Sequence, residues 1–268
     1  MIYLLLVFLP YVVYSQKVHV KDMQKISLSE AAYFPSFGKS DDELLLTSEN
    51  YKGLKIYSLS TGKLTPVTNA TGAGSDPQFT CSGDLLVPVF EYKKGRKHVN
   101  YKVFSPDGTE KPTLKSAPAQ SFPRVSVKGK EINVLFEEGK TVTYSPVGDY
   151  FYVWASFSPD KQKILFTAAG KGTFVMNTDG ELIQELGYLN APQWIDNQWV
   201  TGMADKDDGI MVTESNVIVS HVSSGEKFNL TKNVDVVAMY PEPSPGAGKI
   251  AFHNPEGQIY VLNIELTE

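Results

Sequence analysis

The stretch "FSPDKQKILFT", residues 157 to 167, decides the fold because it is one copy of a unit that recurs along the whole chain. Each copy has a leading residue, often Pro, an apolar residue two positions later, a turn rich in Ser, Gly, Asp or Lys, and an apolar strand. The six copies begin at Phe34, Asp76, Phe122, Ala155, Ala191 and Tyr240. Self-similarity at such a period indicates a repeat architecture.

A second recurring piece follows each copy and consists of a strand, a Gly-bearing turn and usually another strand. Hairpin signals mark four of these turns, at Thr61-Gly62, Asp107-Gly108, Asp179-Gly180 and Ser224-Gly225. Each unit therefore has about four strands. The steps between Pro35, Pro77, Pro123, Ala155, Pro192 and Pro241 are 42, 46, 32, 37 and 49 residues. Their average lies near the roughly 40–45 residues of a four-stranded propeller blade, and we predict an all-β, six-bladed β-propeller.

The last unit lacks room for a fourth strand, because after "QIYVLNIE" the chain continues only with "LTE". Residues 17 to 26, ahead of the first unit, have Val18, Val20 and Ile26 in a strand-like context. An open sheet edge exposes unpaired backbone groups, which propellers avoid by closing the ring. We predict that this N-terminal strand pairs in the last blade and closes the ring.

Composition places the 268-residue chain among ordinary globular proteins, with a formal net charge of −5 and 42% hydrophobic residues. Nothing in this balance favours binding to nucleic acid. Cys81 is the single cysteine, so it has no disulfide partner within the chain, and a small semi-buried residue is favoured over a catalytic thiol. Catalytic and phosphate-binding signatures are absent, the four His are dispersed, and we expect a monomer without a cofactor.

The N-terminal stretch "MIYLLLVFLPYVVYSQK" is apolar from Ile2 to Tyr14. It is shorter than the about 20 residues that a membrane span needs, and Pro10 interrupts it. We predict a signal peptide over residues 1–15, with Val13 and Ser15 at the cleavage site, and a single propeller domain over residues 16–268. No Lys or Arg precedes the apolar stretch, and a buried first strand is the alternative. A cleaved signal peptide implies a periplasmic or secreted protein.

The repeat resembles that of the TolB-type six-bladed propellers, whose blades carry an S-P-D-G turn, then I-A-F, then a D-x-D-G hairpin. The resemblance rests mainly on Phe157-Ser158-Pro159-Asp160, on Ile164-Leu165-Phe166 and on the segment from Phe174 to Gly180. It covers roughly residues 30 to 268 and weakens in the other blades. TolB itself has an α/β domain ahead of its propeller, for which this sequence leaves no space. The resemblance implies export and a binding or scaffolding role.

Propeller geometry places the blade-joining loops and the tips between second and third strands on one rim. The tip of the second blade, "EYKKGRKHVN", is basic within an acidic protein. Clustered cations attract anions, although a charged tip that discourages aggregation is an equal explanation. The candidate binding residues on this rim are Glu91, Tyr92, Lys93, Lys94, Arg96, His98, Tyr152, Trp154, Tyr188 and Tyr240. Packing between blades is the alternative for the aromatic residues.

Carboxylates on the same rim open two further possibilities. Asp205, Asp207 and Asp208 in "DKDDG" are weak candidates for a metal site, since this stretch lacks the downstream Glu of a calcium loop. A polar hairpin tip is the favoured interpretation. Glu49, Glu91, Glu137 and Asp205 also lie at tips, and a pair of them at the right separation would suit glycoside hydrolysis.

The sequence therefore favours an exported, non-catalytic binding or scaffolding protein. Its rim recognises a protein, peptide or glycan of the cell envelope. A polysaccharide-active hydrolase or lyase that uses rim carboxylates is the alternative. A degenerate module that works only within a larger assembly is a third possibility.

Overall fold

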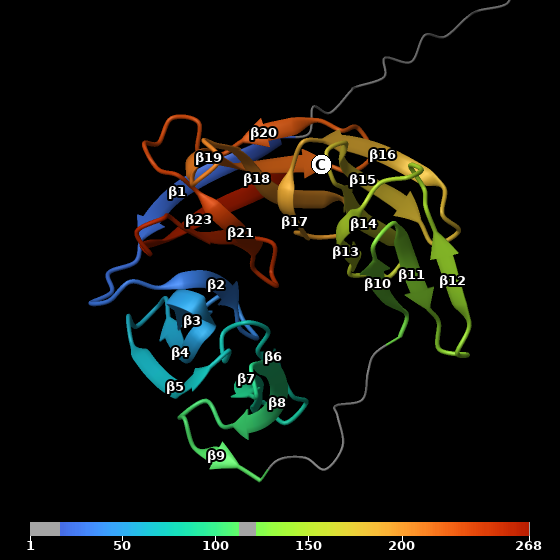
Figure 1. Cartoon of the computed structure of the whole chain (residues 1–268). Coiled ribbons are helices and arrows are strands. Elements are labelled where there is room, and N and C mark those ends of the chain that lie inside the picture. Colours follow the sequence, from blue (N-terminus) through green and yellow to red (C-terminus); the bar gives the residue numbers. More distant parts are fainter. Residues whose placement is uncertain (1–16, 113–121, 268) are drawn as a thin grey trace, which may run out of the picture.

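The computed structural model describes residues 17–112 and 122–267, which form six antiparallel sheets arranged around a common axis (Figure 1). The predicted all-β, six-bladed propeller is confirmed. The one helical element of the described ranges is the short 3-10 turn η1 (Glu49–Tyr51). The predicted signal peptide and its cleavage site lie outside the described residues.

The first three blades follow one another along the chain. The first blade contains β2 (Tyr33–Phe37), β3 (Glu43–Ser48), β4 (Lys52–Ser58) and β5 (Leu64–Thr71). The second contains β6 (Gln78–Phe79), β7 (Leu85–Lys93), β8 (Arg96–Phe104) and β9 (Glu110–Lys111). The third contains β10 (Arg124–Lys128), β11 (Glu131–Leu135) and β12 (Thr141–Tyr144).

The other three blades each have four strands. The fourth contains β13 (Tyr152–Phe157), β14 (Lys163–Ala168), β15 (Gly172–Asn177) and β16 (Leu182–Gly187). The fifth contains β17 (Asn190–Trp194), β18 (Trp199–Asp207), β19 (Val212–His221) and β20 (Lys227–Asn229). The sixth contains β21 (Met239–Pro243), β22 (Lys249–His253), β23 (Ile259–Thr267) and β1 (Lys17–Lys25).

The third blade is an exception to the predicted four strands, because its sheet has the order β10-β11-β12. The chain leaves β12 at Tyr144 and already enters β13, the innermost strand of the next blade, at Tyr152. The intervening residues form a turn, which leaves no length for an outer strand. This is the physical reason for the 32-residue step, the shortest in the repeat.

The predicted ring closure is confirmed, since β1 pairs antiparallel with β23 at the outer edge of the sixth blade. The register runs from Lys17 opposite Thr267 to Lys25 opposite Tyr260, with one bulge. Val18 and Met23 pack against the apolar cluster between the fifth and sixth blades. The two ends of the described chain are therefore held in one sheet.

Apolar clusters hold neighbouring blades together at five interfaces: first to second, third to fourth, fourth to fifth, fifth to sixth and sixth to first. Each is built mainly from strand residues whose side chains face the next sheet, such as Leu165 and Val200 between the fourth and fifth blades. Within the described ranges no such cluster joins the second blade to the third. Residues 113–121, which link these blades in sequence, lie outside the described part.

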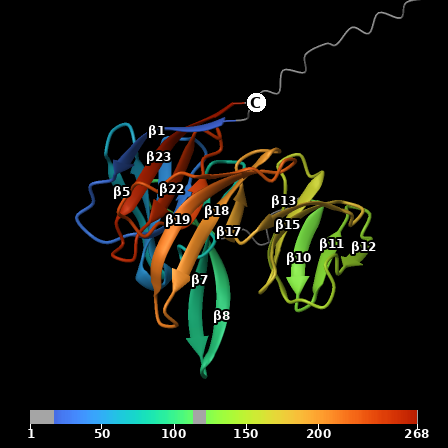
Figure 2. The same ribbon diagram turned by 90° about the horizontal axis from the view of Figure 1, so that it is seen from above.

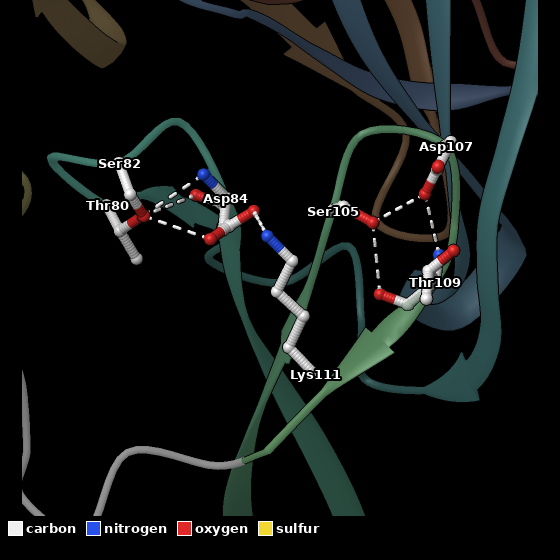
Figure 3. A network of polar contacts seen from close by, with 7 residues as sticks. All are labelled: Thr80, Ser82, Asp84, Ser105, Asp107, Thr109 and Lys111. Atoms are coloured by element: carbon white, nitrogen blue, oxygen red, sulfur yellow. Dashed lines mark hydrogen bonds and ion pairs between the residues drawn. The ribbon is translucent and has the colours of Figure 1, made fainter.

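The turn of the repeat is stabilised by its own side chains. The Ser158 hydroxyl donates to Asp160 at 2.6 Å, and Ser158 Oγ accepts the Lys163 N–H at 2.9 Å. A different turn of the second blade, between its third and fourth strands β8 and β9, has the same pattern, as Figure 3 shows: Ser105 donates to Asp107, which also accepts the Thr109 N–H. These bonds lower the pKa of Asp107 to about 2, with Ser105 contributing most. The turn is structural, because Asp and Ser here bond their own backbone.

At two blade interfaces, a polar residue in the first turn of one blade accepts hydrogen bonds from the first turn of the preceding blade. We call this pair of contacts a clasp. Asp41 Oδ1 accepts the Gly246 N–H at 2.8 Å, and the Asp41 carbonyl accepts Lys249 Nζ at 3.1 Å. Asn197 of the fifth blade makes the same two contacts with the fourth blade. Its Oδ1 accepts the Asp160 N–H at 2.9 Å, and its carbonyl accepts Lys163 Nζ at 3.0 Å. Each clasp therefore links the turn of one blade to the next.

Removal of β1 tests the closure. A variant that lacks residues 1–25 leaves β23 as an open edge, and we expect a lower melting temperature and self-association. Thermal unfolding followed by circular dichroism, with light scattering for association, measures both. A synthetic peptide of residues 17–25 added in trans should partly restore the melt. An unchanged melt without the peptide contradicts the closure.

We expect removal of a clasp bond to destabilise the chain less than removal of β1 does. Asp41→Ala removes one acceptor for the Gly246 N–H, and we expect a loss of about 1 kcal/mol of unfolding free energy in urea titrations. Asp41→Asn keeps a side-chain carbonyl oxygen at this position and is the matched control. Equal losses in both variants contradict the assigned bond.

Candidate binding face at the channel mouth

The blade-joining loops and the tips between second and third strands lie on one side of the propeller, called here the loop rim. Two long hairpins, β7–β8 and β18–β19, project on this side (Figure 2). They belong to the second and fifth blades, which stand opposite each other in a ring of six. The loop rim therefore carries the two longest hairpins of the described structure.

The β7–β8 hairpin carries the predicted basic cluster at its tip. Lys94 and Gly95 form a two-residue turn with φ of 51° and 73°, and Lys93 pairs with Arg96 across it. This geometry is the type I′ turn that matches the twist of a hairpin. Lys93 pairs with Glu91 at 2.9 Å, whereas within the described residues Lys94 and Arg96 have no ion-pair partner. Tyr92, 67% exposed, and the exposed His98 lie on the same hairpin.

The β18–β19 hairpin carries the acidic stretch. Asp208 accepts the N–H groups of Ile210 and Met211 at 2.9 Å, and Asp207 accepts the Gly209 N–H at 2.9 Å. These bonds within the turn lower the pKa of Asp208. In the described ranges no group of three His, Cys, Asp or Glu side chains is placed to hold a metal ion. The structure does not group Asp205, Asp207 and Asp208 as a metal site, and their carboxylates bond their own hairpin and its neighbours.

Tyr188 and Asp205, two residues that the sequence places on this rim, meet in the structure. Asn190 Nδ2 donates to Asp205 Oδ1 at 2.7 Å and to the Tyr188 hydroxyl at 2.8 Å. The Tyr188 hydroxyl donates to the same carboxylate oxygen at 3.2 Å. Desolvation and then Asp205 raise the pKa of Tyr188. The tyrosine ring, 56% exposed, is thereby fixed on the rim.

A repeated bulge shapes the innermost strands at the channel mouth. Phe34, Trp154, Ala191 and Tyr240 all have positive φ, between 44° and 54°, at the bulges of β2, β13, β17 and β21. Bulky residues seldom adopt this conformation, and a bulge re-aims the side chain that it carries. Trp154 is 43% exposed and Tyr240 36%. Both stay accessible, as their assignment to the rim requires.

Tyr152 needs a correction, because only 2% of its surface is exposed. Its ring packs edge-on against Phe166 with the ring centroids 5.6 Å apart. Its hydroxyl donates to the Gly148 carbonyl at 2.9 Å and accepts the Val147 N–H at 3.2 Å. Tyr152 is a packing residue between the third and fourth blades and is not available to a ligand.

A cavity of about 420 Å³ opens at the channel mouth among β2, β17, β21 and the segment that leads into β6. Its lining includes the aromatic residues Phe34, Tyr51 and Tyr240 and the polar residues Asp76, Gln193 and Glu242. The volume lies within the about 300–1,000 Å³ typical of small-molecule sites. The sequence analysis placed Phe34 and Tyr240 on this rim but did not single out Glu242.

Glu242 is the functional candidate that the sequence reasoning missed. Burial raises the pKa of its carboxyl to about 7. The position directly after the repeated Pro or Ala holds Ser36, Gln78, Arg124, Ser156, Gln193 and Glu242 in the six blades. A comparison of the copies at this position would have found it, since Glu242 is the one carboxylate in the series.

The arrangement defines the chain as a β-propeller, and solved structures share the fold. The β-propeller domain of Myceliophteria thermophila Cps50 (Swd1) matches with a TM-score of 0.57 and 8% identity, over 92% of this chain and 99% of that domain. The WD40 repeats of RRP9 match with a TM-score of 0.59 and 8% identity, over 94% and 100%. The tricorn protease matches with a TM-score of 0.53 and 12% identity, over 90% of this chain and 26% of its own.

No protein-family model and no curated protein matches the chain. At these identities the structural matches establish the propeller fold alone, and they do not single out TolB-type propellers. In the part of the chain that the structure describes, no helix has the length and apolar character to span a bilayer.

The raised pKa of Glu242 predicts a pH-dependent stability. A carboxyl whose pKa is higher in the folded state than in the unfolded state costs stability as the pH rises from about 4.5 to about 7. We expect Glu242→Gln to be more stable than the wild type at pH 8, by up to about 3 kcal/mol, and by less than about 1 kcal/mol at pH 5. Thermal melts between these pH values check this. Glu138→Gln, at an exposed turn, is the control. A stability difference between Glu242→Gln and the wild type that does not change with pH contradicts the raised pKa of Glu242.

Proposed function

We propose that the chain is an exported, non-catalytic β-propeller that binds a protein partner on the loop rim. The observation that carries this proposal is the pair of opposed hairpins. One tip presents Lys94 and Arg96, which have no ion-pair partner among the described residues, and the other carries Asp205, Asp207 and Asp208 beside Ile210, which is 90% exposed. A rim with charges of both signs around a channel suits a partner with complementary charges.

Exposed aromatic residues support the same assignment. Tyr92, Trp154, Tyr188 and Phe151 are each more than 40% exposed, and Met211 lies exposed beside Ile210. Aromatic residues and Met are enriched at protein interfaces relative to the rest of a surface. The loop rim therefore combines apolar contact area with charges that orient a partner.

Export to the periplasm or the exterior, and a place close to the TolB-type propellers, are further parts of the proposal. They are supported by the apolar N-terminal stretch and by the repeat around Ser158-Pro159-Asp160. The polysaccharide-active alternative stays a prediction. Two of its rim carboxylates have other partners, since Glu91 pairs with Lys93 and Asp205 accepts from Asn190 and Tyr188. An assay on a glycan panel tests that alternative.

Charge reversal of the basic hairpin tests the proposal. Lys93, Lys94, Arg96 and Lys97 are changed together to Glu, and we expect the loss of envelope proteins that the wild type captures at low salt. Because screening weakens charge contacts, salt should also release them from the wild type. Affinity capture with quantitative mass spectrometry gives the readout.

The control is Lys63→Glu with Lys161→Glu, two exposed lysines between strands on the opposite rim, which changes the net charge half as much. This variant lowers the net charge without touching the hairpin, and it should capture the same proteins as the wild type. Equal capture by the hairpin variant would falsify the placement of the partner on the loop rim.

A further inference from the structure

The cavity at the channel mouth has one face of stacked rings. Phe34 stacks on Tyr51 with centroids 4.6 Å apart and meets the edge of Tyr240 at 5.0 Å. The three residues come from three different places, namely β2, η1 and β21. Positive φ at Phe34, Tyr51 and Tyr240 holds them in this arrangement. Contiguous aromatic faces of this kind attract cations through the negative faces of the rings.

Glu242 supplies a carboxyl to the wall of the same cavity. Within the described ranges it has no hydrogen-bond or ion-pair partner. A carboxylate in such a place loses hydration without compensation, so it either takes up a proton or pairs with a cation. The cavity is thus poised to accept a positive charge.

The other groups around Glu242 do not supply that charge. The cavity lining contains no Lys, Arg or His, and its other ionisable members are Tyr51, Asp76 and Tyr240. The strands β2 and β17 contribute the neutral Ser36 and Gln193. His253 of β22 stacks behind Tyr240 at 5.7 Å, and burial lowers its pKa, which favours the neutral imidazole. The cation must therefore come from outside this cavity.

We infer that this cavity binds the alkylammonium group of a lysine side chain presented by the protein partner, with Glu242 as its counter-ion and Phe34, Tyr51 and Tyr240 as its aromatic wall. The inference rests on the proposed function and names the group that enters the channel. A lysine suits the site because its apolar stem contacts rings while its terminal charge reaches the carboxylate.

A titration of the full chain with Nα-acetyl-lysine methylamide, followed by calorimetry or NMR, tests the site. The uncharged probe is Nα-acetyl-norleucine methylamide, which keeps the four-carbon stem of lysine and lacks only the ammonium group. We expect binding of the charged probe and at least tenfold weaker binding of the uncharged one. Because the pKa of Glu242 is about 7, binding of the charged probe should weaken about tenfold from pH 8 to pH 6. This pH comparison needs no variant, so it does not depend on the folding of a mutant.

Two variants sharpen the result. Glu242→Gln should lose at least tenfold in affinity at pH 8 and should lose the pH dependence, and Tyr240→Leu should weaken binding severalfold. Glu138→Gln, outside the cavity, should bind as the wild type does. Equal binding of the two probes, or affinity unchanged in Glu242→Gln, overturns the inference.

The outcome separates this inference from the proposed function. If the probe does not bind but the hairpin variant still loses its captured proteins, the lysine site is wrong and the loop rim stands. If the probe binds but the hairpin variant captures normally, the cavity binds cations and the proposed partner surface is wrong.

Discussion

The antiparallel pairing of β1 with β23 is the constraint on which the rest of the structure depends. It brings Lys17 and Thr267 into one sheet, so that the first and last described residues of the chain share a blade. Without it the sixth blade ends in an unpaired edge, and the apolar clusters that join it to its neighbours lose Val18, Met23 and Ile26. Those clusters in turn position β2, β17 and β21, the strands that line the channel mouth.

The channel mouth departs from what stability alone favours. Bulky residues in a left-handed backbone conformation cost on the order of 1–3 kcal/mol each, and this chain places three of them, Phe34, Trp154 and Tyr240, at equivalent bulges. The pKa of Glu242, raised to about 7 by burial, marks a further cost nearby. Strain and unpaired charge concentrated at one end of a regular fold are typical of a binding site. On the opposite rim, the positive φ values of non-glycine residues fall on Lys161 and Ala247, which lie in turns and are smaller or more flexible than the rings at the channel mouth.

In the proposed function, the two hairpins and the cavity act at different ranges. Charges on the exposed tips would attract a partner over about 10 Å, the screening length at moderate salt, but solvent-exposed charge pairs contribute little affinity in the complex. A bound side chain in the cavity would displace water from its aromatic wall and carboxyl, so each contact there would contribute more than a contact at an exposed tip. A partner that is oriented by Lys94 and Arg96 on one side and by the acidic hairpin on the other would therefore be fixed by the channel mouth.

The sequence by itself determined the all-β class, the number of blades, the N-terminal strand in the last blade and the basic tip around Lys94, because strand patterns and turn residues recur locally. It predicted four strands for the third blade, which has three. The strand-like stretch that begins at Tyr152 continues the repeat pattern in the sequence, but it forms β13, the innermost strand of the fourth blade. Only the tertiary structure decided that Tyr152 packs between blades while Trp154, two residues later, stays exposed. Only it placed Glu242 beside Phe34 and Tyr51, which are about 200 residues away in sequence. The physical reason is that burial and pairing of a side chain depend on neighbours from other blades, which local periodicity does not encode.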